Sequence, residues 1–189
     1  MKKTKPAILL LLILSACLPA FVGAAQRAAR PRASADKVSV RARGRRSVVV
    51  TEHGHAHTLD LTEHIGAARI EDVSAPFLTS KEGFTYLLLE VCGLSKVPPD
   101  DRQCGAGIEC NVVWLKLDAA WRVRDAKSEL YESCWLPITA EEGPKVEGRR
   151  MTLVVDDLRE EVRREVSYDA DKAEAGLTVR QYPIPKETP

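Results

Sequence analysis

The chain has 189 residues with 28 basic and 27 acidic side chains, and a net charge this close to zero (+1) gives no sign of a nucleic-acid-binding protein. Hydrophobic residues make up 44% of the chain, which is enough for a buried core and excludes disorder throughout. The apolar run 7–14 is too short for a membrane span, which needs about 20 residues.

Residues 1–25 have the pattern of an export signal. Three lysines precede the apolar run, and small residues at 22–25 suit signal peptidase cleavage after Ala24 or Ala25. The competing interpretation is a lipobox at 14–17, whose Cys17 would be lipidated and become the mature N-terminus. Both interpretations place the mature chain outside the cytoplasm, either as a periplasmic or secreted protein or as an anchored lipoprotein.

Residues 26–47 carry eight basic side chains and one acidic side chain, for a net charge of +7, and show no sustained apolar face. Such a segment cannot bury enough surface to offset its ordering entropy, so we expect a basic disordered linker. Electrostatic contact with lipid headgroups or other polyanions is the alternative function of this segment. Residues 48–189 retain 17 basic and 26 acidic side chains, a net charge of −9, so a basic arm precedes an acidic domain.

After this linker the apolar spacing is mostly that of strands. The run 85–91 is almost wholly apolar and indicates a strand buried on both faces, whereas 111–117 alternates between two faces. About eight such runs, separated by glycine and proline, predict a mainly all-β domain over 48–184, an antiparallel β-sandwich or barrel. We expect at most one short helix, near 156–164, a charged segment that could instead be an edge strand. Residues 185–189 form a C-terminal tail.

Besides Cys17, the chain has four cysteines, Cys92, Cys104, Cys110 and Cys134. An even number in an exported domain predicts disulfides rather than a metal site. If the strand 111–117 turns back through 118–120, facing positions sum to 238, which places Cys134 opposite Cys104. Cys92 and Cys110 then lie at the base of a long hairpin. We therefore expect the disulfides Cys92–Cys110 and Cys104–Cys134, each contributing about 2–4 kcal/mol to stability.

All four histidines fall in one stretch, as His53, His55, His57 and His64. On an extended chain the first three project from one face about 6.5–7 Å apart, and neutral imidazoles suit Cu²⁺, Zn²⁺ or Ni²⁺. Carboxylates that could complete such a site are Glu52, Asp60 and Glu63. The alternative is a polar hairpin tip at 51–57 with solvated histidines.

No other pattern indicates a site of chemistry, so we expect a protein that is not an enzyme and has no cofactor besides such a metal. The tryptophans Trp114, Trp121 and Trp135 are interpreted as packing residues rather than a ligand platform. The main hypothesis is a non-enzymatic binding module of the bacterial envelope or exterior, with recognition on the long loop 93–109. The alternatives are a periplasmic metal-binding protein that uses the histidines, and an inhibitor of a cationic extracellular hydrolase.

Overall fold

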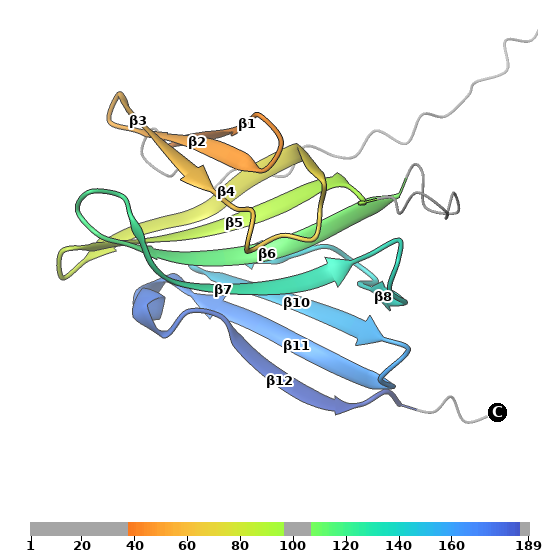
Figure 1. Cartoon of the computed structure of the whole chain (residues 1–189). Helices are drawn as coiled ribbons and strands as arrows, with labels where there is room; N and C mark the ends of the chain where they lie inside the picture. The colour runs from red at the N-terminus through yellow and green to blue at the C-terminus, as the bar shows by residue number, and fades with distance from the viewer. Residues whose placement is uncertain (1–37, 97–106, 186–189) are drawn as a thin grey trace, which may run out of the picture. The chain divides into compact units, whose positions relative to one another are not determined.

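The computed structural model of the chain describes residues 38–96 and 107–185 (Figure 1). These residues form twelve antiparallel strands and one short 3-10 helix, arranged as three sheets rather than one barrel. The predicted mainly β, antiparallel fold is therefore confirmed. None of the described helical residues forms a helix that is both long and apolar enough to span a bilayer. The predicted signal peptide, Cys17 and Cys104 lie outside the described residues.

The N-terminal sheet consists of three antiparallel strands in chain order, β1 (Ser39–Arg43), β2 (Ser47–Glu52) and β3 (His55–Asp60). Strand β1 lies within residues 26–47, where we expect a linker, so the folded domain includes residues 39–43 and does not begin at 48. Val40 and Ala42 pack against a buried cluster while the intervening arginines are exposed. Two small apolar residues among arginines are enough for a strand that only has to cover an existing core.

The middle sheet has four strands in chain order, β4 (Arg69–Lys81), β5 (Phe84–Leu94), β6 (Ile108–Leu117) and β7 (Val123–Glu132). Strands β5 and β6 are its two central strands, and most of their side chains are buried. This confirms the expected strand with two buried faces at 85–91. The two-sided alternation expected at 111–117 is also observed, because Val113 and Trp114 belong to different buried clusters.

The C-terminal sheet has the strand order β12-β11-β10-β8, with β9 also paired to β10. Its elements are β8 (Ile138–Thr139), β9 (Lys145–Glu147), β10 (Arg150–Asp157), β11 (Val162–Asp169) and β12 (Thr178–Pro183), with the 3-10 helix η1 (Ala170–Ala175) between the last two strands. The segment 156–164 is neither the expected helix nor a single edge strand, but a hairpin turn between β10 and β11. The buried Asp157 side chain accepts the backbone N–H groups of Arg159 and Glu160, which fixes this turn.

The middle sheet lies between the other two sheets (Figure 1), and each of its faces borders one of two buried clusters. Alternate residues of β5 and β6 point to opposite faces, so each face has its own apolar surface to bury. The cluster between the middle and N-terminal sheets includes Val48, Val50, Leu59, Leu87, Leu89, Val91, Val113, Leu115 and Leu117. The cluster between the middle and C-terminal sheets includes Leu88, Val112, Trp114, Met151, Leu153, Val155 and Val166. Trp114 also donates from its indole Nε1 to the carbonyl of Ala173, at 3.0 Å, which ties β6 to η1.

A disulfide joins Cys92 and Cys110, which face each other on β5 and β6 with their Cα atoms 4.2 Å apart. This bond was predicted from the sequence and is confirmed. Cys134 is disulfide-bonded as well. Because Cys104 lies outside the described residues, the pairing of Cys104 with Cys134 stays a prediction.

The register between β6 and β7 differs from the one expected. Leu115 faces Ala126, so facing positions sum to 241 rather than 238, and bulges shift the register again at both ends of the ladder. The turn is longer than 118–120, because β7 begins only at Val123. An error of one or more residues in turn length is enough to change every pairing in a hairpin.

Replacing Leu88 or Leu89 with alanine tests whether both faces of the middle sheet are buried. Each side chain is fully buried, but in a different cluster, so we expect each variant to lose about 2–5 kcal/mol of unfolding free energy in urea titrations. Leu158→Ala serves as control, because Leu158 is 56% exposed, and it should stay within about 0.5 kcal/mol of the parent. A two-layer sandwich would instead tolerate one of the two core substitutions.

Candidate functional site

The predicted histidine cluster lies on and around the β2–β3 hairpin. His53 and Gly54 have φ angles of 49° and 83°, so both adopt the left-handed conformation that a two-residue hairpin turn requires. His53 therefore lies in the turn and not on the strand that bears His55 and His57. This arrangement agrees with the alternative interpretation of residues 51–57 as a polar hairpin tip.

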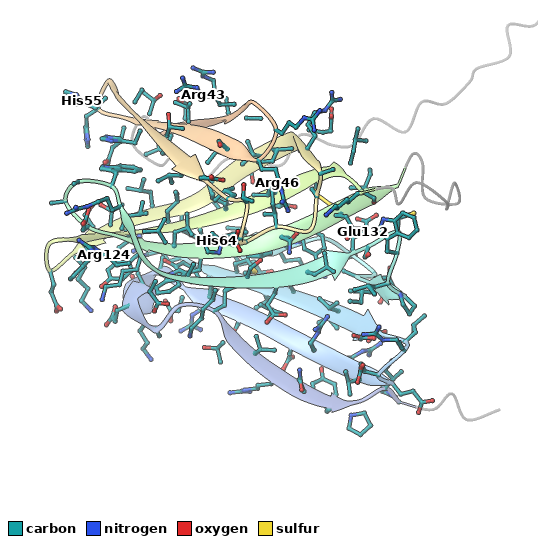
Figure 2. All side chains as sticks on the ribbon, viewed as in Figure 1. Arg43, Arg46, His55, His64, Arg124 and Glu132 are labelled. Carbon is teal, nitrogen blue, oxygen red and sulfur yellow. A yellow bond between two sulfur atoms is a disulfide. The ribbon has the colours of Figure 1, made fainter. Side chains whose placement is uncertain are left out.

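The four imidazoles do not share one environment. His55 is exposed near the hairpin tip (Figure 2), while the His57 ring stacks on Trp121 with 3.9 Å between ring centroids and 1° between ring planes. His64 lies in the segment after β3, where its backbone carbonyl accepts a hydrogen bond from Ser128 Oγ at 2.6 Å. Among the described residues, no three His, Cys, Asp or Glu side chains form a group that could hold a metal ion. Metal binding by the histidines therefore stays a prediction based on their spacing.

The partner of His57 is held by a loop that Asp118 organises. The Asp118 carboxylate accepts the backbone N–H groups of Ala120 and Arg122, both at 2.9 Å. It also accepts the guanidinium Nε of Arg122 at 3.0 Å and of Arg124 at 2.9 Å. These bonds hold Trp121 in a left-handed conformation (φ 60°), which bulky residues rarely adopt without such support.

The Trp121–His57 stack joins the N-terminal sheet to the β6–β7 turn of the middle sheet. Trp121 is partly buried and packs against the cluster between these sheets. The arrangement agrees with the interpretation of this tryptophan as a packing residue. A histidine so engaged contributes to holding β3 in place, which competes with a role as a metal ligand.

A buried carboxylate lies at the opposite end of the middle sheet, close to the disulfides. Glu109 lies on β6 and is only 4% exposed. Of the loop 93–109 on which we expect recognition, residues 93–94 and 108–109 belong to strands and residues 97–106 lie outside the described residues. The Oε1 atom of Glu109 accepts the hydroxyls of Ser95 and Ser133, at 3.1 and 3.0 Å, and the backbone N–H of Cys134 at 3.3 Å. Glu109 therefore links the ends of β5, β6 and β7, which is a structural rather than a catalytic arrangement.

A second exposed feature is a row of arginines on β1 and the turn after it, which belongs to the basic segment 26–47 that sequence reasoning interpreted as a linker or a polyanion contact. This arginine row consists of Arg41, Arg43 and Arg45, all exposed. In the β1–β2 register, Arg41 faces Val49 and Arg43 faces Ser47, which puts both on the side of the sheet away from the buried cluster. Figure 2 shows Arg43 on this outer side. The signal in the sequence was the alternation of arginine with Val40 and Ala42.

The arginine row differs from most other arginines of the domain in its electrostatic environment. Within residues 38–96 and 107–185, none of its three members forms an ion pair. Arg43 instead donates to the Thr58 hydroxyl at 2.9 Å. By contrast, Arg163 donates to both oxygens of Asp156 at 2.6 and 2.7 Å. The arginine row is therefore an uncompensated positive charge on the surface of an acidic domain.

Two neighbours of the arginine row have local roles and do not neutralise it. Asp60 faces Ser47 on the same side of the sheet, but its carboxylate accepts the backbone N–H and the hydroxyl of Thr62, at 2.9 and 2.6 Å. These bonds hold the pKa of Asp60 below its ordinary value. Arg46 is partly buried and donates to the carbonyl of Ile65 at 2.5 Å, so it positions the segment after β3 rather than joining the exposed row.

Replacing Asp118 with asparagine should change how stability depends on pH. Backbone N–H bonds from Arg122, followed by side-chain bonds from Arg124 and Arg122, lower the pKa of Asp118 from 3.8 to about 2. The ionised carboxylate therefore stabilises the fold above pH 3.8, and this stabilisation is lost as the pH falls toward 2.

In urea titrations from pH 2 to 7, Asp118→Asn should lower the unfolding midpoint above pH 4 and flatten its fall below pH 4. Asp72→Asn is the control, since Asp72 is exposed on β4, and it should leave the parental profile in place. Equal profiles for the parent and Asp118→Asn would contradict this role of Asp118.

Glu109→Ala tests the structural role of the buried carboxylate. The substitution leaves two hydroxyls and one backbone N–H without their acceptor, each at a cost of about 1–3 kcal/mol when buried, so we expect a total loss of about 3 kcal/mol. The exposed Glu132 on β7 is the control, and Glu132→Ala should cost less than about 0.5 kcal/mol. Similar unfolding free energies for the two variants would refute the assignment.

Comparison with protein-family models, with curated proteins and with solved structures finds no match to this chain, so the case for its function rests on the features described above.

Proposed function

We propose that this protein is an exported, non-enzymatic binding module that attaches to polyanionic surfaces through the arginine row. One observation carries the proposal: Arg41, Arg43 and Arg45 are exposed and make no ion pair within the described part of the chain. Exposed charges without internal partners are free to meet an external one. Arginine suits this role because its planar guanidinium donates two parallel hydrogen bonds to carboxylate, sulfate or phosphate groups.

Export is supported by the sequence pattern of residues 1–25 and is compatible with the disulfide between Cys92 and Cys110. Disulfides persist in oxidising compartments and are rare in the cytosol. Lipidation at Cys17 stays open as the alternative to simple cleavage, and either route would deliver the folded domain to the envelope or the exterior.

The charge distribution supports a polyanion over a cationic partner at this face. Residues 48–189 carry a net charge of −9, whereas residues 26–47 carry +7. A polyanion would be attracted by the basic face and repelled by the rest of the domain, which gives binding a fixed orientation. This attraction should weaken with salt, because exposed charges are screened beyond about 8 Å at physiological ionic strength.

The inhibitor hypothesis requires acidic groups free to bind a cationic hydrolase. On the C-terminal sheet two acidic side chains already face arginines: Asp156 pairs with Arg163 at 2.6 Å and Asp169 with Arg150 at 3.5 Å. Because these pairs reduce the negative charge that this face presents, we favour the polyanion-binding hypothesis.

Retention on a phosphocellulose column tests the proposal. The triple variant Arg41→Ser, Arg43→Ser, Arg45→Ser should elute at a much lower NaCl concentration than the parent. The matched control is Arg150→Ser, Arg159→Ser, Arg180→Ser, which removes the same charge from exposed positions on and beside the C-terminal sheet and should elute close to the parent. If both triple variants shift equally, only net charge matters and the assignment to β1 is wrong.

A further inference from the structure

Two members of the arginine row, Arg41 and Arg43, share the outer face of the N-terminal sheet. Arg41 and Arg43 are two positions apart on β1, so their side chains leave the same face about 6.5–7 Å from each other. The positions beside them on this face carry short side chains. By register, these are Ser39, Ser47, Thr51, Ala56, Thr58 and Asp60, the last bonded to Thr62. The arginines are the longest side chains on this face, and Arg43 extends over it to donate to the Thr58 hydroxyl at 2.9 Å.

The centre of this face is closed rather than hollow. Val49 points to the same side as Arg41 and Thr58, yet it is only 3% exposed. This face therefore presents the charges of Arg41 and Arg43 to solvent, while the apolar Val49 side chain among them is covered. A planar layer of headgroups matches such a face, whereas proteins that bind single nucleic-acid strands use a positively charged groove that tracks the strand.

The position of β1 in the chain also favours a membrane. In the sequence, residues 26–37 immediately before it contain four basic side chains and one acidic side chain. The 21 peptide steps from Cys17 to Val38 span at most about 75 Å, so lipidation of Cys17 would keep β1 within that distance of the bilayer. A lipid anchor combined with a basic segment is the usual two-part route to stable membrane attachment.

From these observations we infer that the arginine row docks on the anionic phospholipid headgroups of a membrane, with the N-terminal sheet facing the bilayer. This inference rests on the proposed polyanion-binding function and names its partner. Each arginine near an anionic bilayer contributes about fivefold to the partition coefficient, so the three arginines of the row contribute about 150-fold. The net negative charge of residues 48–189 repels the same bilayer, which leaves the basic face as the side that approaches.

Vesicle cosedimentation tests the inference. The protein used is the full chain with the substitution Cys17→Ser, so that no lipid is attached at this position. The parent should bind vesicles of equal parts phosphatidylglycerol and phosphatidylcholine, and should not bind phosphatidylcholine alone. The triple serine variant of the arginine row should lower the partition coefficient at least 100-fold. The triple serine control on and beside the C-terminal sheet should change it less than threefold.

A lysine variant, Arg41→Lys, Arg43→Lys, Arg45→Lys, separates charge from misfolding, and it should bind the anionic vesicles nearly as well as the parent. Retention on phosphocellulose without binding to anionic vesicles would overturn the membrane inference and leave the proposed function standing. If the parent protein neither stays on phosphocellulose nor binds anionic vesicles, both the proposed function and the membrane inference would be overturned. Equal vesicle binding by the serine variant and the parent would refute the arginine row as the docking surface.

Discussion

The two central strands, β5 and β6, are apolar on both faces, and such strands are stable in water only when each face is covered. One covering layer would leave Leu87, Leu89 and their neighbours, or Leu88 and Trp114, exposed to solvent. The chain meets this requirement by adding a sheet on each side. The N-terminal sheet covers one face with three short strands, and the C-terminal sheet covers the other with five. The remaining features of the domain follow from this three-layer requirement.

The N-terminal sheet shows how covering a core can create a binding face. A strand that covers a core needs only one apolar side, so β1 contributes Val40 and Ala42 inward and presents arginine outward. The sheet is further held at the β2–β3 hairpin by the stack of His57 on Trp121, with Asp118 fixing the tryptophan loop. The inner side of β1 therefore serves packing and its outer side carries positive charge. We propose that the outer, charged side is the functional one.

Sequence patterns predicted the parts of this structure that depend on local periodicity. The strand at 85–91 with two buried faces follows from an almost wholly apolar run. The disulfide between Cys92 and Cys110 follows from the position of these cysteines at the ends of two neighbouring strands. Turn geometry was predicted poorly, because it depends on single side chains such as Asp118 and Asp157 that accept backbone N–H groups. The same limit applies to the histidines, since even spacing predicted a shared face but not that His53 would occupy the turn.

The basic charge of residues 26–47 was evident from composition, but the strand that carries Arg41 and Arg43 was not predicted. This strand is short and rich in arginine, and it forms because β2 and the cluster beneath provide a surface to pair with and cover. The pairing of β1 with β2 is local, but the burial of Val40 and Ala42 against the cluster depends on residues distant in the sequence, which strand propensity alone does not reveal.

Native-state hydrogen exchange measures the central claim most directly. If both faces of the middle sheet are buried, the backbone amides of residues 87–91 and 112–116 should exchange only through global unfolding, and much more slowly than those of β1 and β12. Exchange in β5 and β6 as fast as in the edge strands would contradict the three-layer account.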